Sequence, residues 1–296
     1  MKILNPYAKN GTWLRGSFHI HTIASTCGWH SVDEILLAYQ DYDFLAITDH
    51  DRLSRLSEAA GKALFNGLEV SSPNGHMLLI NPPEIILNGY SNEFSVANYQ
   101  KLAELCTTNG GIAILNHPNR FSGISWRLDR MQDISGYTGI EIYSGDGVVY
   151  EEDIAFNVWD QLLSGGRKIW GFGNDDFHHW GQEKRVWNMV LTDSNTPEAI
   201  LEAVRAGSFY ISTGFGFETI ENSAGCIRVV LKNNRVLEKM YKYITFFGRN
   251  GRKLHEVTGR VQEVEYYCTG DEGYVRVAAY HEGGQAAFSQ PLLVLV

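Results

Sequence analysis

Two short histidine-rich segments carry the side chains with the most evident chemistry. In the first, His19 and His21 stand two apart in a segment with strand character, so both imidazoles face the same way. In the second, Asp49 and His50 follow Thr48 and the apolar run 44–47, which predicts a short buried strand. Imidazoles and carboxylates that converge from strand ends form a donor set for a divalent transition metal. The sequence therefore predicts a metallohydrolase organised around this cluster.

Further polar side chains of the same kind follow other predicted strands. Glu69 lies at the end of one strand, His117 follows a second, and the polar segment 174–179 follows a third. Helix patterns separate the strands, over 31–39, 94–109, 149–163 and 196–206. This alternation predicts a parallel sheet, and at this chain length a barrel, in which the carboxyl ends of the strands bring the polar side chains together.

The composition is that of a globular protein that acts on small molecules. The chain has 296 residues, of which 44% are hydrophobic and 20% charged, enough for a barrel and a second domain. The net charge of −9 argues against a long nucleic acid as the partner, whereas bound metals can reverse the local field for a small phosphorylated substrate. The four cysteines form no CxxC pair, and neither a signal peptide nor a membrane span is evident. We expect a cytoplasmic protein without membrane contact; the oligomeric state is not indicated.

The pattern of the chain changes after residue 216. Short alternating segments replace the strand–helix alternation, over 227–231, 241–247, 261–267, 274–280 and 292–296. Such segments, separated by turns, are typical of a small antiparallel β-sandwich. The predicted fold class is therefore α/β, with a barrel domain over 1–216 followed by a β-sandwich domain over 217–296.

Five motifs, in this order, resemble those of the PHP (polymerase and histidinol phosphatase) family. They are His19-Ile20-His21, Ile47-Thr48-Asp49-His50-Asp51, Gly67-Leu68-Glu69-Val70-Ser71, Asn116-His117-Pro118 and Asp176-Phe177-His178. The resemblance spans roughly residues 14–213 and extends to members with an appended C-terminal β-domain. It implies a distorted, TIM-like barrel of seven βα units. It also implies two or three divalent metal ions (Zn, Mn or Fe) at the strand ends, and phosphoesterase activity.

Taken position by position, the resemblance implies eight metal ligands. They are His19, His21, His50, Glu69, His76, His117, Asp176 and His178. Glu69 is the expected bridge between two metals, because a carboxylate can offer one oxygen to each. The assignment of His76 is the least fixed, since the gap after Glu69 varies in the family. Asp176 and His178 are preferred over their neighbours Asp175 and His179 because Asp-x-His matches the family spacing.

One position departs from the family pattern. The family has a further histidine or aspartate five or six residues after the second histidine of the first motif, where this chain has Thr26 and Cys27. Either Cys27 binds a soft metal, or the metal at this position is weak or absent, or His30 substitutes from the following loop. An inert thiol is an equal alternative, because free cysteines are often simply buried. The number of metals therefore stays open.

Three residues are candidates for direct roles in the reaction. Asp49 and His178 are the candidate catalytic residues, Asp49 as a carboxylate that orients an imidazole and His178 as an imidazole that protonates the leaving alkoxide. Arg120, three residues after His117, is the candidate substrate-binding residue, because a guanidinium can hold two phosphate oxygens. The sequence thus predicts a metal-dependent phosphoesterase in which metal-activated water attacks a small phosphoester or nucleotide. Two alternatives stay open: hydrolysis of a carboxyl ester, amide or carbamate, and a non-catalytic PHP module with a β-sandwich binding domain.

Overall fold

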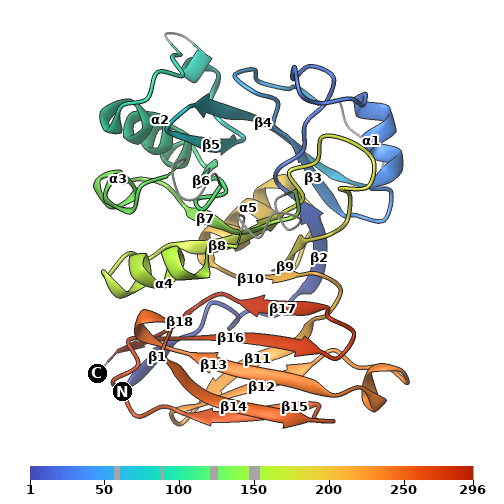
Figure 1. Cartoon of the computed structure of the whole chain (residues 1–296), viewed down its shortest axis with the longest axis vertical. Coiled ribbons are helices and arrows are strands. Elements are labelled where there is room, and N and C mark those ends of the chain that lie inside the picture. The colour runs from blue at the N-terminus through green and yellow to red at the C-terminus, as the bar shows by residue number, and fades with distance from the viewer. Residues whose placement is uncertain (57–60, 88–89, 121–125, 147–153, 296) are drawn as a thin grey trace.

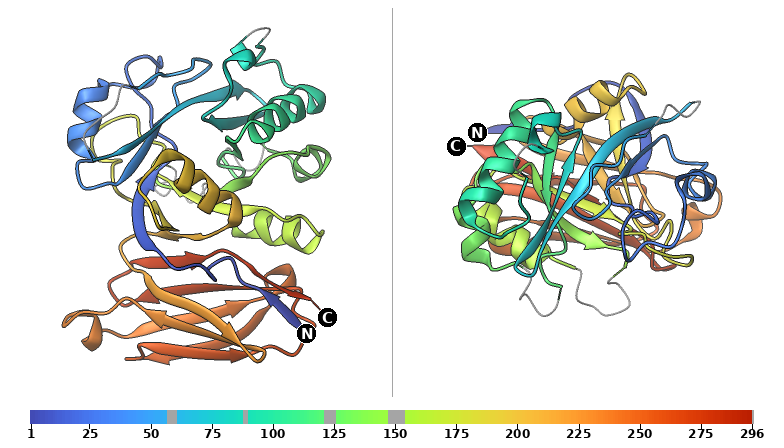
Figure 2. Two further views of the ribbon diagram at one scale, coloured as in Figure 1. Left: turned by 180° about the vertical axis from the view of Figure 1, so that it is seen from behind. Right: turned by 90° about the horizontal axis from the view of Figure 1, so that it is seen from above.

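The computed structural model describes residues 1–56, 61–87, 90–120, 126–146 and 154–295. It is a mixed α/β protein in two stacked parts (Figure 1). The upper part holds the helices and the histidine-rich segments, and the lower part consists of β-strands with short turns. Both chain termini lie side by side in the lower part (Figures 1 and 2). None of the helices in the described residues is long and apolar enough to cross a membrane.

Seven neighbouring strands form the frame of the upper part. In spatial order they are β2 (Thr12–Ser17), β3 (Phe44–Ile47), β4 (Ala63–Ser72), β5 (Gly75–Ile80), β6 (Ile112–Leu115), β7 (Gly139–Ser144) and β8 (Trp170–Asn174). The strands β2, β3 and β4 run parallel, as do β6, β7 and β8. β5 is antiparallel to both of its neighbours, because the turn at Pro73 and Asn74 folds it back on β4. The parallel sheet expected from the sequence is thus interrupted by one hairpin.

Helices cover the outside of this sheet. Within the described residues they are α1 (Val32–Ala38), α2 (Val96–Thr108), α3 (Leu128–Asp133), α4 (Phe156–Ser164) and α5 (Pro197–Ala206). Ser31 and Glu34 form a capping box at the start of α1, as their spacing predicts. The described helices follow β2, β5, β6, β7 and β9. Because this order is not a simple βα repeat, the count of seven βα units stays a prediction.

The free edge of β8 is hydrogen-bonded by two side-chain amides. The Asn188 amide donates to the Gly173 carbonyl at 2.8 Å and accepts from the Gly173 N–H at 3.2 Å. The Gln290 amide makes the same pair of bonds with Gly171, at 2.7 and 2.8 Å. Each amide satisfies one donor and one acceptor of the strand, as a neighbouring strand would. Ile20, after β2, and Phe177, after β8, form a single parallel bridge, so the segments that follow the first and last of these seven strands are in contact.

Two further strands join the upper part to the lower part. β9 (Trp187–Thr192) pairs with β2, and β10 (Phe209–Ser212) pairs with β9 on one side and with β17 on the other. One sheet therefore continues from the upper part into the lower part.

The lower part is a sandwich of two antiparallel layers. A three-stranded layer consists of β11 (Phe217–Ser223), β12 (Cys226–Leu231) and β15 (Glu263–Tyr267). The other layer contains β1 (Lys2–Leu4), β13 (Lys242–Phe247), β14 (Lys253–Gly259), β16 (Tyr274–His281), β17 (Ala286–Ser289) and β18 (Leu292–Leu295). Buried apolar side chains such as Ile227, Phe246 and Val277 fill the space between the layers. The strand β1 comes from the opposite end of the chain and pairs with β18. The domain division at 216/217 stays a prediction.

Candidate metal centre

Histidines and carboxylates gather at one end of the upper sheet, and each of its seven strands or the segment that follows it contributes. In strand order the contributors are His19 and His21, Asp49 and His50, Glu69, His76, His117, Glu141, and Asp176 and His178. The position of His76 depends on the hairpin. Because β5 is antiparallel to β4, its first residues lie at the same end as the last residues of the parallel strands.

Glu69 lies at the centre of the cluster, and its two oxygens face different imidazoles. Oε1 is 3.1 Å from His76 Nδ1, 3.4 Å from His19 Nε2 and 3.6 Å from His117 Nε2. Oε2 is 3.0 Å from His50 Nδ1 and 3.3 Å from His21 Nε2. A carboxylate whose two oxygens point to separate groups of imidazoles has the arrangement of a bridging ligand.

Among the described residues, several buried nitrogen and oxygen atoms of the cluster have no hydrogen-bond partner. Neither ring nitrogen of His117 makes a hydrogen bond, although the residue is only 1% exposed. Asp176 Oδ1 also accepts none, although His19 Nε2 lies 3.0 Å away. The two Nε2 atoms of His19 and His21 face each other at 3.1 Å. Such unpartnered, converging lone pairs are costly in a protein interior, and divalent metals would satisfy them. The donor set therefore fits the metal ions that the sequence implied.

The local charges shift the pKa values of the cluster in opposite directions. Burial would raise the pKa of Glu69, but the imidazoles of His19 and His76 hold it well below its usual range. Burial would also lower the pKa of His19, but Asp176 and Glu141 raise it well above its usual value. Burial and the nearby Arg120 lower the pKa of His117 to about 4. The ring of His117 is thus neutral at pH 7, as a metal ligand must be.

The cluster is closed on one side and open on the other. The side chains of His19, His21 and Glu69 are at most 1% exposed, whereas those of His50 and His76 are 25% and 27% exposed. Arg120 stands at this open margin and donates from its guanidinium to Asp176 Oδ2 at 2.7 Å. The same guanidinium group lies 3.4 Å from Asp146, a residue that the sequence did not single out. His50 and His76 are therefore partly exposed, whereas His19, His21 and Glu69 are shielded.

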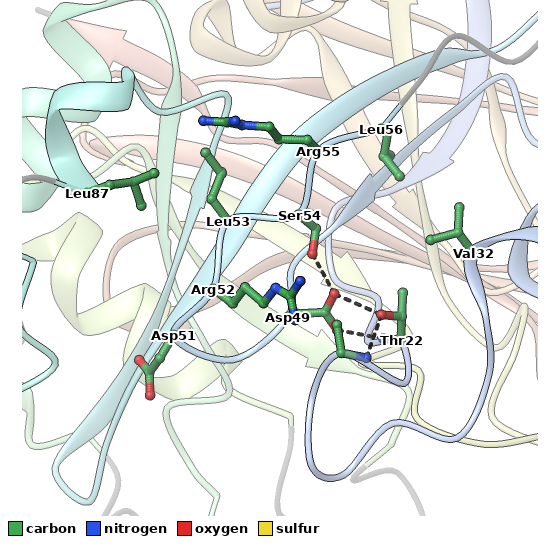
Figure 3. Close-up of a pocket in the computed structure, with 11 residues that line it drawn as sticks. Thr22, Val32, Asp49, Asp51, Arg52, Leu53, Ser54, Arg55, Leu56 and Leu87 are labelled. Carbon is green, nitrogen blue, oxygen red and sulfur yellow. Dashed lines mark hydrogen bonds between the residues drawn. The ribbon is translucent and has the colours of Figure 1, made fainter.

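In the described part of the chain, Asp49 contacts the imidazoles through the Ser25 side chain. Its carboxylate accepts hydrogen bonds from the Thr22 N–H and hydroxyl at 2.7 and 2.9 Å and from the hydroxyls of Ser25 and Ser54. Ser25 Oγ in turn lies 3.2 Å from His21 Nδ1 and accepts from the His50 N–H at 2.9 Å. Figure 3 shows the Asp49 carboxylate between Thr22 and Ser54, beside a pocket of about 690 Å³. The residue positions the segments that carry His21 and His50.

Glu141 is the main functional residue that sequence reasoning missed. It lies inside β7, fully buried, and one of its oxygens is 2.8 Å from His19 Nδ1. The other oxygen accepts from the His117 N–H at 3.1 Å. A carboxylate in this position fixes the ring and tautomer of a metal-binding histidine. A charged residue in the buried run 139–143 was the available signal.

The structure separates the two candidate pairs at the end of β8. Asp176 and His178 lie in the cluster, as described above. Asp175 points elsewhere and accepts from the Tyr39 hydroxyl at 2.7 Å and from three backbone N–H groups of residues 184–186. His179 packs against Trp29, with ring centroids 5.3 Å apart.

Asp176 has φ of 52° and His117 has φ of 29°, and such uncommon backbone conformations concentrate at functional sites.

Cys27 and His30, the two residues near the departure from the family pattern, lie in different environments. Burial would raise the pKa of the Cys27 thiol, but hydrogen bonds with His178 and His50 lower it to about 6. His30 instead packs on Trp180, with ring centroids 3.8 Å apart, and its Nδ1 is 3.8 Å from Glu34. Only Cys27 of the two belongs to a group of converging ligand atoms within the described residues.

Comparison with solved structures supports the fold. No protein-family model and no curated protein sequence matches the chain. A two-domain protein from Bacteroides vulgatus ATCC 8482, described as containing a predicted PHP-like metal-dependent phosphoesterase, superposes with a TM-score of 0.54 at 17% identity, over 95% of this chain and 96% of that one. The chain has this two-domain PHP-like fold. PsfC from Pseudomonas syringae PB-5123 gives a TM-score of 0.47 at 13% identity, over 65% of this chain and 87% of PsfC.

Proposed function

We propose that this protein is a metal-dependent phosphoesterase that hydrolyses a small phosphoester or nucleotide. The observation that carries the proposal is the convergence of five imidazoles on the two oxygens of Glu69, beside an arginine at the open margin. The proposed ligands are His19, His21, His50, Glu69, His76, His117, Asp176 and His178, which would hold two or three divalent ions. The structural neighbour, which is described as containing a predicted PHP-like metal-dependent phosphoesterase, agrees with this proposal.

The side chains have separate tasks in the proposed reaction. The bound metals supply Lewis-acid activation of water and of the phosphoryl group. Arg120 binds phosphate oxygens, because its guanidinium lies at the open margin and offers donors in a fixed fork. The catalytic role expected for His178, which is 15% exposed at the same margin, stays a prediction, because a metal-bound imidazole does not donate a proton to the leaving oxygen. Glu141 and Asp49 hold the imidazoles in place from behind.

The test is an assay with three chromogenic esters after loading with Mn or Zn. We expect turnover of p-nitrophenyl phosphate or its bis-ester, and no turnover of a nitrophenyl carboxyl ester. Asp176→Asn should lower kcat/KM by about 10²-fold or more, because it removes a negatively charged metal ligand from the cluster. The matched control is His255→Asn in β14, far along the chain in the lower part, which should retain full activity.

Two results would contradict the proposal. Preferential turnover of the carboxyl ester would favour the alternative hydrolase. Absence of both metal uptake and turnover would favour a non-catalytic module.

A further inference from the structure

We propose that the thiolate of Cys27 is a metal ligand, in a Cys–His position that it shares with His50 and His178 on the open side of the metal centre. The inference rests on the proposed metal centre and adds a soft donor to it. It also implies a preference among metals, since thiolate ligands favour Zn²⁺ or Fe²⁺ over Mg²⁺ and Mn²⁺.

The geometry of four side chains carries the inference. The ligand atoms of His21, Cys27, His50 and His178 all lie within 4.8 Å of one another. The ring of His21 stacks on that of His178, with centroids 4.3 Å apart and planes at 23°. The ring of His21 also contacts the ring of His50, with centroids 4.5 Å apart. Cys27 thus faces a set of imidazoles rather than an apolar pocket.

In each of the two partner rings, the contacts at Nδ1 leave Nε2 as the nitrogen that can bind a metal. His178 Nδ1 lies 2.7 Å from the Asp176 carbonyl oxygen, which can only accept, so Nδ1 carries the proton. His50 Nδ1 is 3.0 Å from the Glu69 carboxylate and also contacts Ser71. A neutral imidazole protonated on Nδ1 has its lone pair on Nε2. Each ring therefore keeps Nε2 available as a ligand atom.

The loop that carries Cys27 is held in place against His178. The Trp29 N–H donates to the His178 carbonyl at 3.1 Å, and the Ile23 N–H donates to the His30 carbonyl at 2.8 Å. Gly28, the next residue after Cys27, packs so closely that a Cβ there would lie 2.1 Å from the Thr22 carbonyl oxygen. These contacts fix the backbone on the C-terminal side of Cys27 beside the segment that carries His178.

The other three cysteines provide a contrast. Cys106 is buried in α2 and points at the carbonyl oxygens of Ile80 and Ile112, at 3.5 and 3.4 Å. Cys226 begins β12, and Cys268 follows β15, both in the lower part. In the described residues, none of these three thiols belongs to a group of converging ligand atoms.

Cobalt(II) spectroscopy of the full-length protein tests the inference without an activity readout. A thiolate bound to Co²⁺ gives a near-ultraviolet charge-transfer band, whereas imidazole and carboxylate ligands give only visible d–d bands. We expect this band in the wild type and in the triple variant C106S/C226S/C268S, and its loss in Cys27→Ser. The d–d bands and the uptake of cobalt at the remaining positions should persist in Cys27→Ser. Thermal melting of each variant shows that it is folded.

Metal selectivity provides a second measurement. The Cys27 thiol loses its proton when it binds a metal. An aspartate in its place would offer a harder oxygen ligand, so the preference for zinc over manganese should weaken. In Cys27→Asp, the ratio of zinc to manganese affinity should fall by roughly tenfold or more.

The outcomes separate this inference from the proposed function. Cobalt uptake without a charge-transfer band, or a band that survives in Cys27→Ser, overturns the ligand role of Cys27 and leaves the metal centre in place. No cobalt uptake by the wild type overturns the metal centre, and the role of Cys27 with it.

Discussion

Glu141 holds the ring of His19 through Nδ1, while Nε2 of the same ring faces His21 and Asp176. An imidazole with one nitrogen bound to a supporting carboxylate and the other facing the ligand cluster is typical of metal-binding histidines. Asn174 donates to Glu141 at 2.9 Å, so the carboxylate is itself fixed.

Replacing Glu141 by glutamine should have a larger effect on metal affinity than on the free energy of unfolding. Glu141→Gln keeps the size of the side chain but removes the charge, and we expect metal affinity to fall about 10–100-fold. Competition with a chromophoric chelator measures the affinity. Asp129→Asn, an exposed carboxylate change in α3, is the control and should leave the affinity unchanged. Equal affinities for Glu141→Gln and the wild type would show that the contact is only structural.

The stabilisation by added metal should increase with pH. Burial lowers the pKa values of His50 and His178, but Glu69, Asp176 and Cys27 raise them to about 10 and about 9 in the metal-free protein. Protonated rings stabilise the metal-free fold at low pH, and this contribution disappears as the pH rises through those raised values. Metal binding requires the deprotonated rings, so protons compete with it. The rise in Tm on adding Zn²⁺ should therefore be larger at pH 8 than at pH 6. A rise that is independent of pH would contradict these assignments.

At the scale of elements, the hairpin of β4 and β5 and the segment after β8 do most to shape the site. The hairpin brings His76 to the end of the sheet where the parallel strands finish. After β8, the chain turns so that Asp176 enters the cluster. Asp175 instead binds Tyr39, the residue that ends α1, and the segment that leads into β9.

Asp175 should therefore matter for stability rather than for metal binding. In Asp175→Asn, an amide NH₂ would face backbone N–H donors, leaving a buried donor without a partner. We expect a loss of about 1–3 kcal/mol in the free energy of unfolding, measured by urea denaturation. His179→Asn, at an exposed position four residues on, should cost less than about 0.5 kcal/mol. A variant of Asp175 with unchanged stability would refute this role.

At the scale of the whole molecule, the two parts share a sheet and a buried ion pair. Arg276 of β16 donates to Asp160 of α4 at 2.6 and 2.8 Å, and both side chains are less than 10% exposed. The Tyr274 hydroxyl donates to the same carboxylate at 2.6 Å. Gln290 adds hydrogen bonds from the lower part to β8, so the lower part supports the strand that delivers Asp176 and His178.

Breaking the ion pair should destabilise the whole protein. Arg276→Met leaves the Asp160 carboxylate buried and unpaired, so we expect a loss of about 3–5 kcal/mol in the free energy of unfolding. The double change Asp160→Leu with Arg276→Met should cost less than the single change. The control, Arg228→Met, removes an exposed pair with Glu263 and should cost at most about 1 kcal/mol. A single transition in calorimetry, shifted by Arg276→Met, would show that both parts unfold together. Two transitions with only one of them shifted would contradict this.

The sequence by itself determined the donor set and the type of fold. Motifs such as His19-Ile20-His21 and Asp176-Phe177-His178 stand at strand ends, and side-chain alternation within a strand predicts which of their members face together. Alternating strands and helices indicated the α/β class, and the α/β fold with an appended β part is confirmed by the structural likeness. These features are local, so spacing along the chain is enough to predict them.

Only the tertiary structure decided which groups meet across the sheet. Glu141, Asn188 and Gln290 contact residues 122, 15 and 119 positions away, and nothing in their local sequence indicates those partners. The same holds for Cys27, whose four-atom neighbourhood depends on how three separate segments pack. Long-range contacts are set by packing and by the need to satisfy buried polar groups, and a local pattern does not contain them.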